Sequence, residues 1–219
     1  MSDPSSFEQH AQIGGALSLE GDTQRISDYY RDWAQSYDDD LSAETYHAPD
    51  LMGDWLVELA AARGLGTPGK LRVFDAGCGT GLLGLALARC GIRILSGADL
   101  SPEMVEQARQ TKAYRDLHGD IDLNQPLPAE LAGPFDAVMA AGVFTQGHVG
   151  PDALDGLIDT LAPGGLLIIS VRDGYRDLYD LDATLDALVE AGRVERVDRK
   201  ADAPYVGADT ADYYALARC

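Results

Sequence analysis

Basic residues are scarce in this sequence. Lysine and arginine together number 17, against 36 aspartates and glutamates, so the 219-residue chain carries a formal net charge of −19. A field of that sign repels phosphate backbones and anionic membrane surfaces. The composition therefore argues against nucleic-acid and membrane partners and leaves neutral or cationic small molecules open. Solubility alone is the more common reason for such a charge.

Cysteine and long apolar runs are scarce as well. The three cysteines, Cys78, Cys90 and Cys219, form no spaced cluster, which argues against a disulfide framework and a zinc site. No apolar run approaches the length of a membrane span, and the first residues lack the basic and apolar pattern of a secretion signal. We therefore expect a protein of the reducing cytoplasm without a metal site.

The pattern of apolar residues divides the chain into three parts. Residues 1–22 are polar and are predicted to be flexible, and residues 23–66 carry two helical patterns that predict an N-terminal helical lid. From residue 70 to residue 219, strand and helix patterns alternate as in a doubly wound, mostly parallel α/β sheet. The seven expected strands are 71–75, 93–98, 115–119, 135–140, 165–171 and an antiparallel edge pair, 194–199 and 212–217; the expected helices are 82–90, 102–111, 151–161 and 178–191.

Nine residues carry most of the functional information. Residues 73–81 read Val-Phe-Asp-Ala-Gly-Cys-Gly-Thr-Gly, so that an apolar run ends in a carboxylate, three glycines follow at alternate positions, and a helical pattern begins. Glycine permits positive φ and lets a ligand approach the main chain closely. The helix start behind the loop offers free N–H groups to that ligand. The segment is therefore typical of a loop that holds a nucleotide-like cofactor.

Two kinds of cofactor fit this loop. Gly79, Gly81 and Gly84 satisfy the dinucleotide pattern, and Asp99 stands about 20 residues further on, at a strand end where a carboxylate can bind ribose hydroxyls. An NAD(P)-dependent short-chain oxidoreductase is thus one hypothesis. The carboxylate of Asp75, however, can reach the loop's own amides or a ligand ammonium, and it would repel a pyrophosphate. A cofactor with a zwitterionic amino-acid end would tolerate it.

Further motifs follow in order over residues 70–171. They are Asp75-x-Gly77-x-Gly79-x-Gly81, Asp99, Asp120-Ile121, Phe135-Asp136-Ala137-Val138 and Leu161-Ala162-Pro163-Gly164-Gly165. In this order they resemble the class I S-adenosylmethionine-dependent methyltransferases. The resemblance implies the Rossmann-like methyltransferase sheet of that family, with S-adenosylmethionine as cofactor and S-adenosylhomocysteine as its product.

The resemblance also implies roles for single residues. The loop at residues 77–81 would line the methionine end of the cofactor, and Asp99 would take the ribose hydroxyls. Asp120 would accept from the adenine amino group, with Ile121 against the ring, although a helix cap also explains Asp120. Gly142 would face the sulfonium and the acceptor. The full set implied for the cofactor within the core is Asp75, Gly77, Cys78, Gly79, Gly81, Asp99, Leu100, Asp120, Ile121 and Gly142.

A narrower resemblance extends upstream of the loop. The motifs Tyr30-x-x-Trp33-Ala34-x-x-Tyr37-Asp38-x-Asp40 and Tyr46-x-Ala48-Pro49 are similar to those of the methyltransferase-like family of the Williams–Beuren syndrome region. Tyr30 and Tyr37 fall on one face of a helix, and a phenol has an apolar face and a polar tip. Both tyrosines are therefore predicted to cover the cofactor, whereas core packing explains Trp33 equally well.

Catalytic residues are less clearly marked. His47 and His148 are candidates for a general base, although each is also explained as a loop residue. Asp173 follows the fifth strand at its carboxyl end, where substrate groups lie in such sheets. Because a sulfonium is already an activated leaving group, methyl transfer needs mainly alignment and desolvation of the acceptor. The prediction is in-line methyl transfer to a small molecule, with the oxidoreductase and a non-catalytic cofactor-binding protein as alternatives and no oligomeric state implied.

Overall fold

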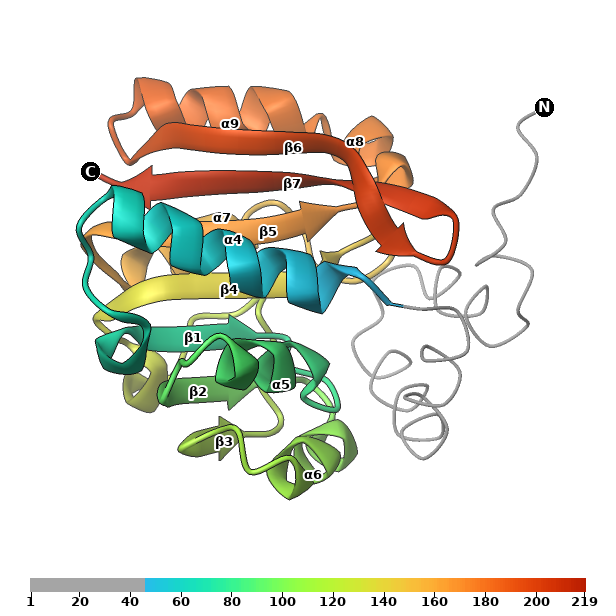
Figure 1. The fold of residues 1–219 in the computed structure, drawn as a ribbon. Coiled ribbons are helices and arrows are strands. Elements are labelled where there is room, and N and C mark those ends of the chain that lie inside the picture. Colours follow the sequence, from blue (N-terminus) through green and yellow to red (C-terminus); the bar gives the residue numbers. More distant parts are fainter. Residues whose placement is uncertain (1–45) are drawn as a thin grey trace.

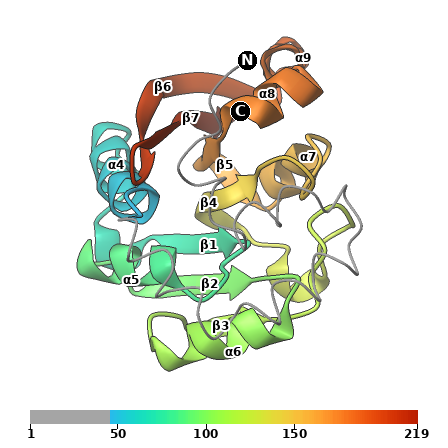
Figure 2. The same ribbon diagram turned by 90° about the vertical axis from the view of Figure 1, so that its right-hand side faces the viewer.

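A computed structural model of the chain describes residues 46–219, and these form a single seven-stranded sheet with helices on both faces (Figures 1 and 2). The strand order is β3-β2-β1-β4-β5-β7-β6, with β1 to β5 parallel and β7 antiparallel to both of its neighbours. The doubly wound, mostly parallel α/β sheet is therefore confirmed. The strands are β1 (Arg72–Ala76), β2 (Ile94–Ala98), β3 (Asp116–His118), β4 (Phe135–Phe144), β5 (Leu161–Val171), β6 (Val194–Val206) and β7 (Asp209–Arg218).

Helices connect the parallel strands and fill the two outer layers. In chain order they are α4 (Ala48–Ala62), α5 (Leu82–Arg89), α6 (Pro102–Gln110), α7 (Ala153–Asp159), α8 (Asp173–Tyr179) and α9 (Leu181–Glu190), with short 3-10 helices at Pro68–Lys70 and Ala129–Leu131. Successive residues of the central strands serve opposite faces, since Val138 and Ile169 belong to one buried cluster and Met139 and Ile168 to the other. This alternation gives the sheet an apolar core on each side.

Helix α4 covers most of the described part of the segment predicted as an N-terminal lid. Met52, Trp55 and Leu56 are buried in the apolar cluster that α4 shares with α5 and the sheet. The indole Nε1–H of Trp55 also donates to Asp198 Oδ2 at 3.3 Å. The last part of the segment 23–66 is therefore a helix of the layer that covers the sheet, because its apolar stripe is needed against the strands. Residues 23–45 of the predicted lid lie outside the described part of the chain.

The C-terminal hairpin forms the antiparallel edge pair that the sequence predicts. Strand β7 lies between β5 and β6, and only β6 is at the edge. The two burial patterns explain this placement: Ala211 to Ala217 are all buried, whereas β6 exposes charged residues along most of its length. Both strands are also longer than expected, and Tyr46 forms an isolated bridge to Val206 near the hairpin tip.

Two helix boundaries also differ from the sequence prediction. The helix expected over 178–191 is divided into α8 and α9 by Asp180, which has a φ of +44° and accepts a hydrogen bond from the Ala183 N–H. The helix expected over 151–161 ends at Asp159, because Leu161 and the following Pro163-Gly164-Gly165 segment already belong to β5.

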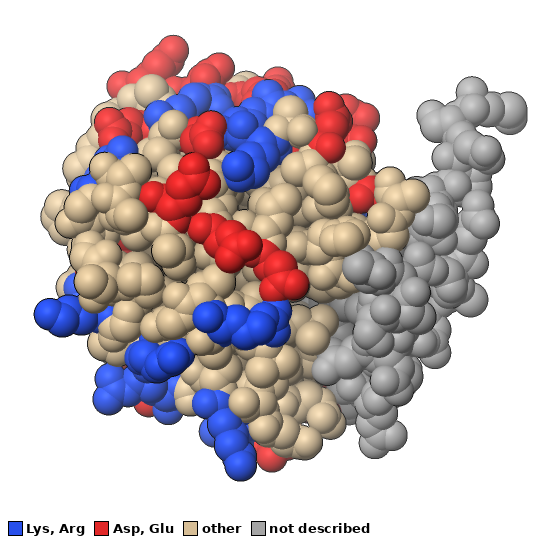
Figure 3. Space-filling model, viewed as in Figure 1, with Lys and Arg blue, Asp and Glu red and all other residues tan. Residues whose placement is uncertain are grey.

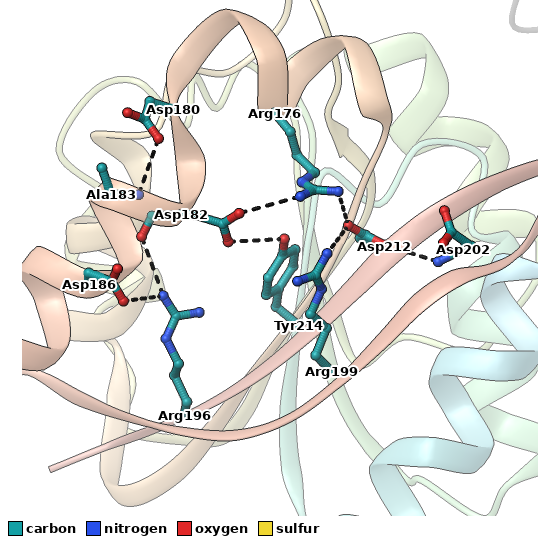
Figure 4. Close-up of polar contacts among 10 residues, drawn as sticks. All are labelled: Arg176, Asp180, Asp182, Ala183, Asp186, Arg196, Arg199, Asp202, Asp212 and Tyr214. Atoms are coloured by element: carbon teal, nitrogen blue, oxygen red, sulfur yellow. Dashed lines mark hydrogen bonds and ion pairs between the residues drawn. The ribbon is translucent and has the colours of Figure 1, made fainter.

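An ion-pair network ties α8 and α9 to the hairpin (Figure 4). Asp212 of β7 is only 1% exposed, and its Oδ2 accepts from Arg176 Nη1 at 2.5 Å and from Arg199 Nη2 at 2.7 Å. Its other oxygen accepts from the Asp202 N–H at 3.0 Å. Asp182 of α9 adds an ion pair to Arg176 at 3.4 Å. One buried carboxylate thus joins three separate segments.

Charges of both signs occur on the face covered by α4 (Figure 3). Acidic side chains run across this face, and lysines and arginines lie on either side of them. Within residues 46–219, no helix is long and apolar enough to cross a membrane, and no three His, Cys, Asp or Glu side chains gather as metal ligands.

Candidate functional site

The glycine loop lies at the carboxyl end of β1, the position that ligands occupy in open α/β sheets. Gly77, Gly79 and Gly81 all have positive φ, at 79°, 51° and 95°. A Cβ on Gly77 would also lie 2.3 Å from Val143 Cγ2, so glycine is required there by conformation and by space. The N–H groups of Gly77 and Cys78 both donate to Ala98 O, at 2.8 and 2.9 Å, which fixes the loop to the end of β2.

A pocket opens above this loop. No atom of residues 46–219 lies within 4 Å of the place where a Cβ of Gly79 would stand, so this part of the loop is open on the side of the described residues. Helix α5 begins behind the loop with Gly81 as its N-cap, and no side chain in the described part of the chain caps it. Its first-turn N–H groups therefore resemble the helix N-termini that bind polar ligand groups. The pocket is lined by Tyr46, Pro49, Gly77, Cys78, Gly79, Thr80, Leu82, Leu83 and Ala141.

The carboxylate of Asp99 lies beside the loop and connects it to α6. Oδ2 accepts from the Gly79 N–H at 2.8 Å, and Oδ1 accepts from the Ser101 N–H at 2.9 Å. Ser101 in turn caps α6 by accepting from the Met104 N–H. Burial raises the pKa of Asp99, against the opposing effect of the N–H donors, among them Leu100. Asp99 thus holds the glycine loop and the start of α6 in place.

The segment after β3 is joined to the same strand end. The Asp99 N–H donates to His118 O, and the Ile121 N–H donates to Asp99 O, both at 3.0 Å. Asp120 between them is exposed and has a φ of +57°. The structure therefore brings the two predicted adenine residues to the edge that holds the glycine loop. No side-chain cap by Asp120 occurs in the described residues, since Asp122 makes the local turn bond to the Asn124 N–H.

Asp75 is completely buried at the end of β1. Its Oδ2 accepts from the hydroxyl of Tyr114 at 2.6 Å, while Oδ1 has no hydrogen-bond partner among the described residues. Burial raises the pKa of Asp75 to about 7; the Tyr114 hydrogen bond lowers it and Asp99 raises it further. The N–H groups of Gly77 and Cys78 bond to Ala98 O and that of Gly79 bonds to Asp99, so the loop amides, the first of the two partners that the sequence left open for Asp75, are not its partners here.

Tyr114 is a site residue that sequence reasoning missed. Its ring lies against the main chain of α5 and β2, where a Cβ on Gly84 would come within 2.3 Å of Cζ, and one on Gly97 within 2.8 Å of Cε1. Gly84, the last glycine of the dinucleotide pattern, is thus explained by the space that Tyr114 needs. No local sequence signal marks this contact, because the three residues meet only in the folded sheet.

Gly142 lies next to Ala141, which lines the pocket together with Tyr46. The Gly142 N–H donates to Ser170 Oγ at 2.9 Å, and a Cβ there would stand 3.0 Å from the hydroxyl of Tyr205 and 3.2 Å from that of Tyr46. The two tyrosine rings meet edge to face with centroids 5.3 Å apart. The tip of the β6–β7 hairpin therefore reaches the end of β4. The sequence did not reveal this contact, because the two segments are far apart along the chain.

An ion pair supports this side of the site. Arg172, at the end of β5, pairs with Asp209 at 3.3 Å, with the two side chains 15% and 11% exposed. The Arg172 guanidinium also lies 5.7 Å from the ring centroid of Tyr205. The Tyr205 hydroxyl is thus held in a buried, polar setting, and burial raises its pKa.

The predicted catalytic residues differ in how deeply they are buried. His148 lies in the loop after β4 with its Nδ1 3.1 Å from Gln146 O, and burial lowers its pKa, so its imidazole is neutral near pH 7. His47 is exposed at the start of α4, and Asp173 is exposed at the start of α8. Burial, followed by Asp99 and Asp75, raises the pKa of Cys78 well above its usual range, so it is a thiol. Tyr30 and Tyr37 lie outside the described residues.

Known proteins are similar to this chain in sequence and in fold. A family model described as a methyltransferase domain matches residues 74–167. Human methyltransferase-like protein 27 is 35% identical over 191 residues, which cover 86% of this chain and 75% of the human protein. The chain belongs to the class I S-adenosylmethionine-dependent methyltransferases. The cofactor is therefore S-adenosylmethionine, and the oxidoreductase hypothesis is wrong.

Two further comparisons place this methyltransferase among its relatives. The ribosomal protein L11 methyltransferase of Chromohalobacter salexigens is 33% identical over 141 residues, covering 60% of this chain and 45% of that protein, so the chain spans less than half of it. The crystal structure of magnesium protoporphyrin IX methyltransferase from Synechocystis PCC 6803 with bound S-adenosylhomocysteine superposes with a TM-score of 0.65. The two sequences are 20% identical, and the superposition covers 90% of this chain and 100% of the Synechocystis chain, which supports the fold.

Proposed function

We propose that this methyltransferase transfers the methyl group of S-adenosylmethionine to a small-molecule acceptor by in-line displacement at the carboxyl edge of β1, β2 and β4. The observation that carries the proposal is the pocket between the glycine loop and Tyr46, whose ring contacts that of Tyr205. One side has main-chain and carboxylate groups for a zwitterionic nucleoside, and the other has the hydroxyls of half-buried Tyr46 and buried Tyr205 near Gly142.

The residues on the loop side fit the cofactor. The unpartnered Oδ1 of buried Asp75 offers an acceptor for the amino group of the methionine end, and the open side of Gly79 leaves room beside the main chain. Asp99 would take the ribose hydroxyls while it holds Gly79, and Asp120 with Ile121 would take the adenine. Tyr30 and Tyr37 remain proposed as cover for the cofactor.

The other side of the pocket supports an acceptor of small size. Tyr205 is only 6% exposed, and its hydroxyl and that of Tyr46 close in on Gly142. Arg172 and Asp209 neutralise each other behind them, so no net charge is offered there by this pair. An acceptor with one hydrogen-bonding group and a compact apolar body suits such a wall. The net charge of −19 further disfavours a nucleic-acid acceptor.

The proposed reaction requires little acid–base catalysis by the protein. The bound cofactor supplies the activated methyl group, and the chain has to align and desolvate the acceptor. If the acceptor atom arrives protonated, His148 is the best placed of the proposed bases, because its imidazole is neutral and follows the strand that carries Gly142. His47 and Asp173 are weaker candidates because both are exposed.

The test is turnover of S-adenosylmethionine to S-adenosylhomocysteine against two panels of acceptors, one of metabolites and one of proteins. Turnover that depends on a metabolite supports the proposal. Turnover that depends only on the protein panel, which includes ribosomal proteins because of the Chromohalobacter relative, would refute the small-molecule acceptor. Calorimetric titration with S-adenosylhomocysteine checks separately that the cofactor end of the site is competent.

A further inference from the structure

Tyr114 occupies a position that suggests more than packing. It stands between α6 and β3, and its hydroxyl reaches the carboxylate of Asp75 with an O···O distance of 2.6 Å. Gly84 and Gly97 leave the ring space on the main chains of α5 and β2, so the hydroxyl is held by two rigid elements. A hydrogen bond this short to a buried carboxylate fixes the plane of the carboxyl group.

The surroundings of Asp75 make this one bond important. Its register partners on the neighbouring strands are Gly97 and Met139, which carry no charge. Among the titratable groups around it, Asp99 opposes ionisation, Tyr114 favours it, and Cys78 is a neutral thiol. Burial is the largest effect and raises the pKa of Asp75 to about 7. Without the phenol, the carboxyl group would therefore be protonated over a wider pH range.

We infer that Tyr114 is a positioning residue for the cofactor: its hydroxyl holds Oδ2 of Asp75, so that Oδ1 stays available to accept from the cofactor's amino group. The inference rests on the proposed placement of the amino-acid end of the cofactor beside Asp75. The geometry supports it because the two carboxylate oxygens differ, one bonded to Tyr114 and one without a partner among residues 46–219. A proton on Oδ1 would remove that acceptor, so the Tyr114 bond also keeps the site in its binding form.

Tyr114→Phe tests the inference, because it keeps the ring and removes only the hydroxyl. Calorimetric titration of the full chain between about pH 6 and 8.5 should show wild-type affinity for S-adenosylhomocysteine rising through about pH 7 as Asp75 ionises. In Tyr114→Phe the midpoint of this rise should move upward, and affinity at pH 7 should fall about two- to tenfold. In Asp75→Asn the rise should be absent.

A ligand control separates positioning from general damage. Methylthioadenosine has the nucleoside but lacks the amino-acid end, so its affinity should be unchanged in Tyr114→Phe. Equal losses for both ligands with an unmoved midpoint would overturn the inference and leave Tyr114 a packing residue. Wild-type protein that binds methylthioadenosine and S-adenosylhomocysteine equally well at every pH would instead refute the proposed placement of the amino-acid end.

Two further variants guard against a folding defect. Tyr213→Phe is the matched control, because it also deletes a tyrosine hydrogen bond, to Pro204 O at 2.7 Å, without touching Asp75. It should leave the pH midpoint unchanged. If Tyr114→Phe does not fold, 3-fluorotyrosine at position 114 keeps the ring and strengthens the phenol as a donor. The midpoint should then move downward, and an unmoved midpoint would overturn the inference.

Discussion

Asp99 and Gly79 are joined by a hydrogen bond of 2.8 Å, from the loop N–H to the carboxylate that the family resemblance assigns to ribose. The second oxygen of Asp99 accepts from the Ser101 N–H at the start of α6. The residue proposed to recognise the cofactor therefore also shapes the loop that cradles it. Any variant of Asp99 changes both, and the two effects have to be measured apart.

Asp99→Ala should weaken binding of S-adenosylhomocysteine by about 10- to 100-fold, because a charge-assisted contact and the loop anchor are lost together. A cofactor analogue without the ribose 2′-hydroxyl divides these effects. Wild-type protein should bind the analogue more weakly than S-adenosylhomocysteine, and Asp99→Ala should bind the two alike. If the variant keeps the full preference for the hydroxyl, Asp99 acts on the loop alone.

Gly84→Ala should destabilise the protein by about 1–3 kcal/mol, since the new methyl group would meet the Tyr114 ring at 2.3 Å. The effect should exceed the gain in helix propensity that alanine brings to α5. Thermal and urea unfolding measure it. Gly156→Ala in α7 is the matched control, because no described residue lies within 4 Å of its Cβ position, and it should be neutral or stabilising. Equal behaviour of the two variants would contradict the packing of Tyr114 against α5.

Asp75 should make the stability of the ligand-free protein depend on pH. Its pKa of about 7 in the fold lies above the ordinary value of 3.8, so folding favours the protonated form. The stabilising contribution is complete below about pH 4 and is lost as the pH rises through about 7. Wild-type stability should therefore fall over that window relative to Asp75→Asn, as measured by urea unfolding. Parallel curves for the two proteins would contradict a raised pKa.

Asp212→Ala should lower the free energy of unfolding by about 3 kcal/mol, because it leaves Arg176 and Arg199 without their shared, buried carboxylate. The loss should appear in thermal unfolding and as faster hydrogen exchange in the β6–β7 hairpin. Asp186→Ala removes an exposed ion pair with Arg196 and should cost less than about 1 kcal/mol. A similar cost for both would show that the Asp212 network does not hold the hairpin.

Tyr205→Phe should reduce turnover more than cofactor binding. The hydroxyl beside Gly142 belongs to the proposed acceptor wall, so kcat/KM for an identified acceptor should fall about two- to tenfold. Affinity for S-adenosylhomocysteine should be unchanged. A variant that loses cofactor affinity and keeps its kcat would place Tyr205 on the cofactor side instead.

Local patterns were enough to predict much of this protein. Apolar runs that end at Asp75 and Asp99, each followed by a helical pattern, predicted the β1–α5–β2–α6 order, which the structure confirms. Such signals are local because strands and helix caps depend on neighbouring residues. Boundaries were less accurate. Residues 161–165 and Asp180 were misplaced because a bulged strand and a left-handed residue depend on the partners they meet in the fold.

The site was predicted in part for the same reason. The loop glycines, Asp99, Asp120 and Gly142 do meet at one sheet edge, because parallel strands bring their carboxyl ends together. Tyr114 and Tyr205 were not found. Their partners, Asp75 and Gly142, lie 39 and 63 positions away along the chain.

The sequence by itself determined the methyltransferase family, the cofactor and the alternation of strands and helices. Each of these depends on short motifs of neighbouring residues and on the order of those motifs along the chain. Only the tertiary structure decided that α4 covers the sheet, that β7 lies inside it, and that Tyr114 supports the buried carboxylate of Asp75. These features depend on which apolar faces pack against each other and on which buried polar atoms form hydrogen bonds. Burial and pairing are properties of the whole packed chain.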